Sequence, residues 1–436
     1  NDTPPAYSHR KNNPCQRLIP YSPRMKRGLY NLGIRSYRLL VKIASLRNPK
    51  ARKLITGQKS IFPYLEKNVL KEGGYIWIHA SSLGEFEQGR PLIEKIKESY
   101  PDKKIAITFF SPSGYEVRKN YPLADLICYL PFDLPNNVNR FLDLVKPSVA
   151  IFIKYEFWGN YLRELRRRQI PTYIVSAIFR PDQIFFRPYG ELFRRMLRTY
   201  AHLYVQNEQS RELLARIGIN NVSTIGDTRF DRVVDIRRQA KELPIVKAFA
   251  VNKNVLVAGS SWPKDEDIFI DYFNRHPELR LIIAPHEIHE GHISDIIGKL
   301  KRPFVRYSQT DENAAVTADC LIIDCFGLLS SIYQYGQIAY IGGGFGVGIH
   351  NVPEAAVYGI PVIFGPNYKK FREAKTLTVA GGAFSINDIS EFEALMKHLE
   401  NDPSYRLQCG EIAAKYIYSN TGATKKILDD IAPVLQ

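Results

Sequence analysis

Cysteine is scarce in this sequence and is scattered along it. None of the five cysteines forms a CxxC pair or joins histidines at a metal-ligand spacing. The sequence therefore predicts no zinc site, and an odd number of distant cysteines does not suggest a disulfide framework. This usage favours a reduced, cytosolic compartment. The cysteines are Cys15, Cys128, Cys320, Cys325 and Cys409.

Long apolar runs are also missing from the N-terminal part. In the stretch 28–46 the longest uncharged run, 28–34, has seven residues, whereas a membrane-spanning helix needs about 20. The preceding residues contain no apolar core like that of a secretory signal peptide. We therefore predict no spanning helix here and expect residues 1–27 to form a disordered basic arm.

Acidic residues are nearly absent from the first 60 positions. That stretch holds 14 lysines and arginines and one acidic residue, Asp2, so most of the net charge of +16 lies there. Such a charge favours a nucleic acid or an anionic membrane as partner. Helical spacing within 28–60 separates a basic face from an apolar face, which predicts an interfacial amphipathic segment on a membrane. A basic helix docked on its own domain is the alternative. The basic face holds Arg27, Asn31, Arg35, Arg38 and Lys42, and the apolar face holds Tyr30, Tyr37, Leu40, Val41 and Ala44.

The rest of the 436-residue chain has the composition of a soluble globular protein, since 45% of the residues are hydrophobic and 24% are charged. Short apolar runs such as 105–110, 148–153 and 172–177 alternate with helical segments, and a second series of this kind follows. This alternation predicts an α/β fold with two doubly wound Rossmann-like domains facing a cleft. The predicted parts are an N-terminal domain over 61–231, a linker over 232–250 and a C-terminal domain over 251–436.

A carboxylate stands where the first predicted strand turns into a helix. The stretch HASSLGEFEQG, residues 79–89, follows the apolar run 75–78 and contains Glu85. Ser82-x-x-Glu85 has the spacing of a capping box, in which the glutamate only satisfies backbone N–H groups. However, strand ends of this fold line the ligand crevice, and Gly84 leaves space beside the carboxylate. Both interpretations stay open on the residues alone.

A glycine-rich loop follows the apolar run 338–341. Five glycines occur between 342 and 348, and a helix is predicted to open at Asn351 with Glu354 in its first turn. Such a loop lets backbone N–H groups approach an anion. No acidic residue ends the next strand, as a dinucleotide site would require. Glu354 instead suits the ribose of a nucleotide sugar, with a capping box Asn351-x-x-Glu354 as the alternative.

Four motifs together resemble those of the 3-deoxy-D-manno-octulosonic acid (Kdo) transferases: HASSLGEFEQG, YEFWGN (155–160), GDTRFD (226–231) and GGGFGVGIHNVPE (342–354). The similarity runs from about residue 30 to the end of the chain. It implies an inverting, metal-independent enzyme of the glycosyltransferase B fold. The implied donor is CMP-Kdo on the C-terminal domain. The implied acceptor is the glucosamine disaccharide lipid A precursor (lipid IVA) on the N-terminal domain, at the cytoplasmic face of the bacterial inner membrane.

The resemblance also implies roles for individual residues. Glu85 matches the general base, which the reaction needs because a sugar hydroxyl is a poor nucleophile until it loses its proton. Glu156 and Arg229 match groups that stabilise the transition state. No metal and no cofactor is implied. The nucleotide contacts carry over to Pro285, His286, Gly342, Gly343, Gly344, Asn351, Val352, Pro353 and Glu354.

Two motifs depart from the family pattern. The family's Pro-Arg-His appears as Pro285-His286-Glu287, so the donor phosphate has lost an arginine, and His286 or Lys369 is a candidate replacement. The family's Gly-Ser-Thr-His appears as GSSW, residues 259–262. These departures affect individual contacts with CMP and leave the class of enzyme unchanged.

Several features allow more than one interpretation. Nine arginines between Arg163 and Arg198 suit either the phosphates of the lipid or a solvated helix face. Trp158 suits either the core or a sugar platform. The histidines at 286, 289 and 292 could share one helical face, although we expect no metal there. The competing functions are a UDP-sugar-dependent transferase of the same fold and a basic nucleic-acid-binding protein, but no interleaved aromatic RNA motif or zinc module supports the latter.

Overall fold

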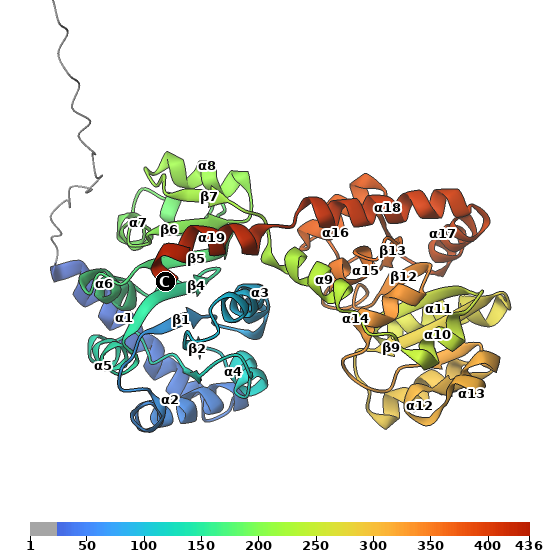
Figure 1. Cartoon of the computed structure of the whole chain (residues 1–436), viewed down its shortest axis with the longest axis horizontal. Helices are drawn as coiled ribbons and strands as arrows, with labels where there is room; N and C mark the ends of the chain where they lie inside the picture. The colour runs from blue at the N-terminus through green and yellow to red at the C-terminus, as the bar shows by residue number, and fades with distance from the viewer. Residues whose placement is uncertain (1–23) are drawn as a thin grey trace, which may run out of the picture.

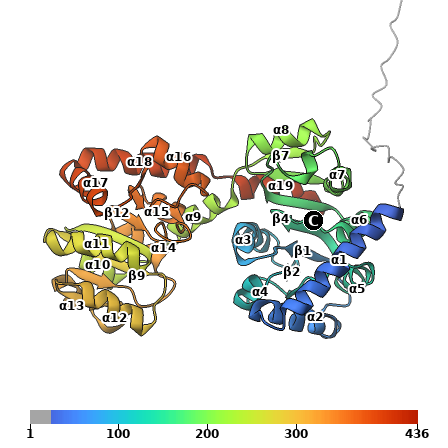
Figure 2. The same ribbon diagram turned by 180° about the vertical axis from the view of Figure 1, so that it is seen from behind.

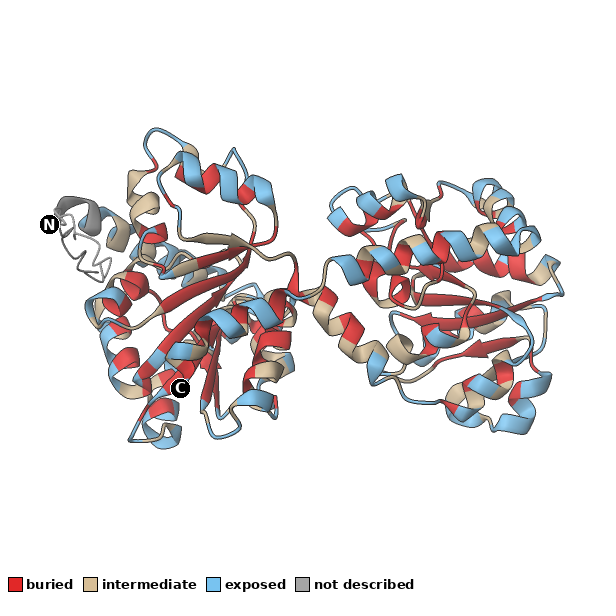
Figure 3. Ribbon diagram, turned by 45° about the horizontal axis from the view of Figure 1, so that its top comes forward, coloured by how far each residue is buried: buried red, intermediate tan, exposed pale blue. Residues whose placement is uncertain are grey.

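The computed structural model describes residues 24–436, and the side chains from residue 28 onward. Residues 1–23, which hold most of the predicted basic arm, lie outside the described part. Two α/β domains lie side by side, with the N-terminal half of the chain in one and most of the C-terminal half in the other (Figure 1). Figure 3 shows buried strands inside both domains and helices that expose their outer faces. The predicted fold of two Rossmann-like domains is confirmed.

The N-terminal domain is built on a seven-stranded sheet of order β3-β2-β1-β4-β5-β6-β7, with parallel neighbours. The apolar runs are buried on both faces because helices cover the sheet on both sides, as a parallel sheet requires. The order reverses between β1 and β4, and this switch point is where doubly wound sheets open a ligand crevice. The strands are β1 Tyr75–His79, β2 Ile105–Phe109, β3 Leu126–Tyr129, β4 Pro147–Ile153, β5 Thr172–Ala177, β6 His202–Val205 and β7 Val222–Thr224.

The helices of this domain begin with two that precede the first strand. Helix α2 belongs to the domain itself, since Leu54, Ile61 and Leu65 are buried in its core, although we had predicted the domain to begin at residue 61. The helices are α1 Arg24–Ala44, α2 Pro49–Asn68, α3 Leu83–Ser99, α4 Pro112–Arg118, α5 Pro135–Val145, α6 Gly159–Arg167, α7 Glu191–Leu197 and α8 Glu208–Arg216, with the 3-10 turn η1 Ile184–Phe186.

The C-terminal domain has a second seven-stranded parallel sheet, of order β10-β11-β9-β8-β12-β13-β14. Its order reverses between β8 and β12, and the glycine-rich loop follows β12. Strands β3, β10 and β14 were not predicted, and all three lie at an edge of their sheet. The strands are β8 Asn254–Ser261, β9 Leu279–Pro285, β10 Phe304–Arg306, β11 Cys320–Ile322, β12 Ile338–Ile341, β13 Val362–Phe364 and β14 Ala383–Ser385.

The helices of the C-terminal half cover both faces of this sheet and also connect the domains. Helix α9 contacts α3 in one domain and α14, α15 and α18 in the other, so the predicted linker over 232–250 is largely helical. The helices are α9 Thr228–Arg238, α10 Pro244–Ala250, α11 Pro263–Arg275, α12 Glu290–Lys299, α13 Glu312–Thr317, α14 Leu329–Ile332, α15 Val352–Ala356, α16 Arg372–Ala380, α17 Ile389–Asn401, α18 Pro403–Ser419 and α19 Ala423–Leu435, with 3-10 turns η2 Tyr307–Gln309 and η3 Tyr333–Tyr335.

The last helix, α19, returns to the N-terminal domain (Figure 1). Its apolar residues Ile427, Ile431 and Leu435 are buried in the same cluster as the strands of the first sheet. Asp231 of α9 accepts the backbone N–H groups of Gly422 and Thr424 and so caps the start of α19. The predicted C-terminal domain, 251–436, therefore differs from the structure in its last helix, because the apolar face of α19 finds its partners across the junction.

Helix α1 lies across the N-terminal domain beside α5 and α6 (Figure 2). Tyr30 and Val41 pack against the domain core. The other side of the helix exposes apolar side chains instead of burying them, and Leu29, for example, is 72% exposed. The predicted apolar face is therefore split, since Leu40 is exposed, whereas half-exposed Tyr37 lies against Phe110 and buried Phe132. The exposed apolar residues of this segment are Leu29, Leu32, Leu39, Leu40, Ile43 and Leu46.

Candidate functional site

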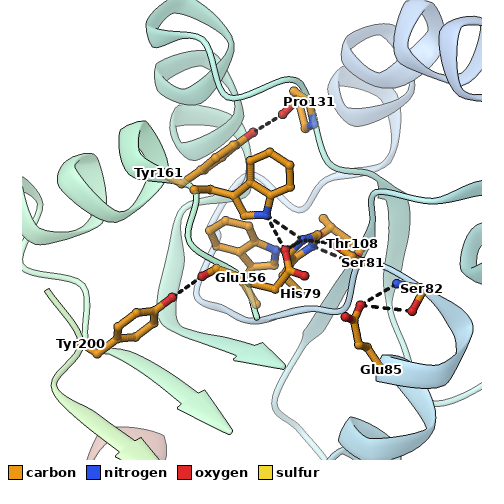
Figure 4. A network of polar contacts seen from close by, with 11 residues as sticks. His79, Ser81, Ser82, Glu85, Thr108, Pro131, Glu156, Tyr161 and Tyr200 are labelled. Atoms are coloured by element: carbon orange, nitrogen blue, oxygen red, sulfur yellow. Dashed lines mark hydrogen bonds and ion pairs between the residues drawn. The ribbon is translucent and has the colours of Figure 1, made fainter. Parts of the chain in front are cut away.

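Glu85 lies in the first turn of α3, directly after β1. Its Oε2 accepts hydrogen bonds from the backbone N–H of Ser82 at 2.9 Å and from the Ser82 hydroxyl at 3.2 Å (Figure 4). The side chain is nevertheless only half-buried. Burial raises the pKa of Glu85 above its ordinary value of 4.5, and the negative charge of Glu156 raises it further, against the bonds from Ser82. The carboxylate thus caps the helix and also has the raised pKa that suits a general base.

Glu156 follows β4, the strand next to β1 across the switch point. Its side chain is buried, and Oε2 accepts hydrogen bonds from His79 Nε2 at 3.0 Å and from Trp158 Nε1 at 2.5 Å (Figure 4). Burial by itself would raise the pKa of Glu156, but the charge of His79 and the hydrogen bonds from His79, Ser81 and Trp158 lower it below 4.5. Glu156 is therefore held ionised inside the domain, and its backbone carbonyl accepts a bond from the Tyr200 hydroxyl.

His79 is a site residue whose role the sequence did not predict. It is the last residue of β1 and is fully buried. Nε2 faces Glu156, while Nδ1 lies 3.0 Å from the backbone oxygen of Thr108 and 2.8 Å from its hydroxyl. A histidine at the end of a buried strand was the only signal available in the sequence. The structure uses it to hold the second carboxylate.

Arg229 lies in the first turn of α9, at the junction of the domains. Its guanidinium donates to both oxygens of Asp227, with Nη2 to Oδ2 at 2.7 Å, and the same nitrogen lies 3.5 Å from Glu373 Oε1 on α16. Arg229 is therefore paired with an acidic residue two positions before it in the chain. The contact with Glu373 places this half-buried cation between the two domains.

Lys154 is another residue that sequence reasoning missed. It directly follows β4 and adopts a left-handed backbone with φ of 69°, which is uncommon for a residue with a side chain and is found at functional sites. Burial lowers the pKa of Lys154, and the neighbouring charge of Arg229 lowers it further, whereas Glu85 and Asp227 oppose this. A half-buried ammonium group is thus exposed to the charges of Glu85, Asp227 and Arg229.

The glycine-rich loop of the C-terminal domain is held by a hydrogen bond to a buried carboxylate, that of Asp265. Asp265 Oδ2 accepts the N–H of Gly343 at 2.8 Å, and Oδ1 accepts the hydroxyl of Tyr340 at 2.9 Å. The N–H of Gly342 donates to the Gly259 carbonyl at 2.9 Å. The amides of Gly342 and Gly343 are thus engaged within the domain. Glycine is required because Gly343 has a φ of 94° and because a side chain at Gly342 would collide with the backbone of Ser260.

A cavity of about 160 Å³ opens beside this loop, at the switch point between β8 and β12. Glu354 is one of its polar side chains and accepts a hydrogen bond from Asn351 Nδ2 at 2.7 Å. This is a side-chain pair and not the capping box that was the alternative interpretation. Burial raises the pKa of Glu354, and Asn351 opposes the shift. Gly344 packs on Gly365, and Val352 and Pro353 are buried inside α15. The cavity is lined by Ser260, Leu329, Tyr333, Ile341, His350, Asn351 and Glu354.

His286 lies after β9, which ends at Pro285, where the family has an arginine. Its ring stacks on Trp262, with centroids 4.7 Å apart, and on His350, with centroids 4.4 Å apart. Trp262 Nε1 donates to His350 Nε2 at 3.1 Å. Burial and the neighbouring His286 lower the pKa of His350 to about 4. The two departures from the family pattern therefore meet in one aromatic stack at the edge of the cavity.

The three histidines at 286, 289 and 292 do not gather into a metal site. His289 caps α12 by accepting the N–H of His292, whose Nδ1 faces the carbonyl of Glu287. Over residues 24–436 no group of three or more His, Cys, Asp or Glu side chains is arranged to hold a metal ion. Within the same part of the chain, no helix is long and apolar enough to cross a membrane.

Comparison with known proteins agrees with these observations. Residues 50–232 match the family model for 3-deoxy-D-manno-octulosonic-acid transferase (kdotransferase). A 3-deoxy-D-manno-octulosonic acid transferase of Haemophilus influenzae is 26% identical over 375 residues, covering 83% of this chain and 87% of that protein. The Aquifex aeolicus enzyme is 28% identical over 350 residues, covering 78% and 90%. A bifunctional glycosyltransferase/methyltransferase of Fusobacterium nucleatum is 27% identical over 345 residues, which are 76% of this chain and 54% of that longer protein.

Solved structures share the fold at low sequence identity. A UDP-GlcNAc 2-epimerase from Neisseria meningitidis superposes with a TM-score of 0.57 and 16% identity, over 82% of this chain and 100% of that one. MurG of Acinetobacter baumannii superposes with a TM-score of 0.52 and 12% identity, over 83% and 99%. At this identity the likeness shows the fold alone.

The two Rossmann-like domains, each with polar side chains at the switch point of its sheet, have the two-domain fold of the glycosyltransferase B type. The match over residues 50–232 and the relatives that cover about four fifths of the chain show to which glycosyltransferases this chain is similar. Over these spans the chain resembles the Kdo transferases, as its motifs had indicated.

Proposed function

We propose that this protein transfers Kdo from CMP-Kdo to the glucosamine disaccharide of a lipid A precursor. The observation that carries the proposal is Glu85, a half-buried carboxylate of raised pKa at the switch point of the N-terminal sheet. A hydroxyl of the acceptor attacks the anomeric carbon of Kdo and gives its proton to Glu85. The bond from that carbon to the phosphate oxygen breaks, and CMP leaves with the electron pair. Direct displacement of this kind inverts the anomeric centre.

The C-terminal cavity suits the donor. Glu354 lies where a ribose hydroxyl can donate to it, and the loop held by Asp265 shapes the adjoining surface. CMP departs with added negative charge, which a fixed positive group stabilises. Lys154 interacts electrostatically with Glu85 and Arg229, and Arg229 contacts Glu373 at the domain junction. We assign Lys154 and Arg229 to the phosphate and the sugar carboxylate of CMP-Kdo. No metal ion takes part in this scheme.

The face formed by α1, α6 and α7 suits an anionic lipid surface (Figures 1 and 2). Helix α1 presents Leu32, Leu39 and Ile43 to the outside, next to Arg35 and Lys42, which are also exposed. Apolar groups enter the headgroup region while basic groups stay on the phosphates. Several arginines of α6 and α7 are paired with Glu164 or Glu191, so they act as a mixed network and not as free cations. The protein would then lie on the cytoplasmic face of the inner membrane.

The test is donor choice followed by product analysis. In thermal unfolding of the purified protein, CMP should raise the melting temperature and UDP should not. Incubation with CMP-Kdo and lipid IVA in vesicles should add one or more Kdo masses to the lipid, as read by mass spectrometry. Protection by UDP alone, or transfer from a UDP-sugar, would replace this proposal with the UDP-dependent alternative.

A further inference from the structure

One tyrosine joins helix α1 to two separate points of the N-terminal domain. The hydroxyl of Tyr30 donates to Asp133 Oδ2 at 2.6 Å and accepts the backbone N–H of Gly159 at 2.9 Å. The ring lies against Gly159 itself, because a Cβ built there would be 3.1 Å from Tyr30 Cζ. Gly159 is the first residue of α6 and stands three positions after Glu156. Tyr30 therefore reaches directly to the segment that carries the buried carboxylate.

Asp133 completes this junction. It is fully buried, and its two oxygens accept the backbone N–H groups of Asn160 at 3.0 Å and Tyr161 at 3.0 Å. It thereby satisfies donors that the first turn of a helix leaves without intrahelical partners. A second side chain of α1 adds to the contact, since Asn160 Nδ2 donates to Asn31 Oδ1 at 2.8 Å. The start of α6 is therefore held by hydrogen bonds to Asp133 and by hydrogen bonds to two side chains of α1.

The start of α6 in turn holds the Glu156 segment. The carbonyl of Trp158 accepts the N–H of Leu162 at 2.9 Å, so Trp158 is tied to the first turn of α6. The indole N–H of Trp158 donates to Glu156. Its ring also packs on Phe110 with centroids 4.8 Å apart, and Phe110 packs on Tyr37 of α1 with centroids 6.3 Å apart. Helix α1 thus contacts the segment through a hydroxyl and through a row of aromatic rings.

We propose that Tyr30 is a positioning residue that couples the lipid-facing helix α1 to the Glu156–Gly159 segment. The apolar surface of α1 then stays at a fixed distance from Glu85 and Glu156. As a result, the hydroxyl of a lipid held on α1 reaches Glu85 at a constant depth from the membrane surface. This inference rests on the proposed function for the roles of α1 and the carboxylates. It adds that the Tyr30 hydroxyl, which touches neither substrate, contributes to turnover. A misplacement of about 1 Å can cost on the order of a hundredfold in rate.

The test is Tyr30→Phe, which removes one oxygen and keeps the ring. We expect kcat with CMP-Kdo and lipid IVA to fall at least tenfold, while KM for each substrate stays within about twofold of wild type. Sedimentation with vesicles of phosphatidylethanolamine and phosphatidylglycerol should be unchanged. Backbone hydrogen exchange should rise at Gly159 and Asn160, because the Gly159 amide has lost its acceptor. Unchanged kcat, or a fall in kcat that accompanies loss of vesicle binding, would overturn the proposal.

The matched control is Tyr121→Phe. Tyr121 is a buried tyrosine of the same domain, and its ring packs against Phe86 and Arg90 instead of against the start of α6. It should leave kcat and exchange at Gly159 unchanged, so an equal loss in both variants would contradict a specific role for Tyr30. The exchange measurement needs no substrate. If the wild-type protein transferred no Kdo, the proposed function would be wrong. If hydrogen exchange at Gly159 were unchanged in Tyr30→Phe, only the proposed coupling through Tyr30 would be wrong.

Discussion

Nε2 of His79 lies 3.0 Å from Oε2 of Glu156, and both side chains are buried at the switch point of the N-terminal sheet. The two residues come from the ends of adjacent strands, β1 and β4, so the parallel register of the sheet sets their approach. The charge of Glu156 also raises the pKa of Glu85. One buried pair therefore influences the carboxylate to which we assign the proton transfer.

Removing His79 should destabilise the protein, because it leaves a buried carboxylate without its main partner. We expect His79→Ala to lower the free energy of unfolding by about 3–5 kcal/mol, measured by urea denaturation at pH 7. Glu156 has a lowered pKa in the folded protein, so its ionised form stabilises the fold above pH 4.5, and this contribution disappears as the pH falls through the folded pKa.

The loss in His79→Ala should therefore shrink in acid. The double variant His79→Ala, Glu156→Gln should be less destabilised at pH 7 than the sum of the two single variants, since neither buried charge is then left alone. Additive losses would show that the two side chains do not stabilise each other.

Glu85→Gln should abolish most of the transfer while the variant still binds CMP. The amide keeps an oxygen that can accept from Ser82, so the cap of α3 is retained. We expect kcat to fall by about 10²–10⁴, the usual contribution of a general base. The wild-type rate should decline in acid with an apparent pKa above 4.5, because the base must be ionised and its pKa is raised.

The pH profile separates this role from a purely structural one. In Glu85→Gln the acidic decline of the residual rate should vanish. If the variant turned over near the wild-type rate, or if it kept the same acidic decline, another group would be the base.

Glu354→Gln should weaken CMP binding but leave the rate of Kdo transfer from the bound donor unchanged. The carboxylate lines the cavity and is the strongest acceptor available to a ribose hydroxyl there. We expect the dissociation constant for CMP, by calorimetry, to rise about tenfold. Glu312→Gln, an exposed glutamate on α13 of the same domain, is the control. An unchanged affinity for CMP in Glu354→Gln would show that the ribose does not bind to Glu354 in this cavity.

Charged substitutions on the outer face of α1 should reduce membrane binding. The pair Leu32→Asp, Ile43→Asp removes two exposed apolar side chains, 60% and 56% exposed, that make little contact with the domain. Sedimentation with phosphatidylglycerol vesicles should fall about tenfold or more, while thermal protection by CMP stays the same. Leu407→Asp, which changes an exposed leucine of α18, should not alter sedimentation. Equal binding by all variants would exclude α1 as the docking surface.

Local patterns were sufficient for much of the fold. The apolar runs that became β1, β2, β4 and β5 were long enough to be recognised, and the carboxylate and glycine motifs fell at strand ends as the fold predicts. Contacts between residues far apart in the chain could not be predicted in this way. Asp265 binds the amide of Gly343, 78 positions away, and nothing in the local sequence around α11 indicates that contact.

The sequence by itself determined the α/β class, the resemblance to the Kdo transferases and the residues at which chemistry was to be sought, because these depend on hydrophobic periodicity and short motifs. The tertiary structure alone decided that α19 returns to the first domain, that His79 holds Glu156 and that Tyr30 meets Gly159 across 129 positions. Those contacts join residues far apart along the chain. They arise from strand order and helix docking, which local pattern does not encode.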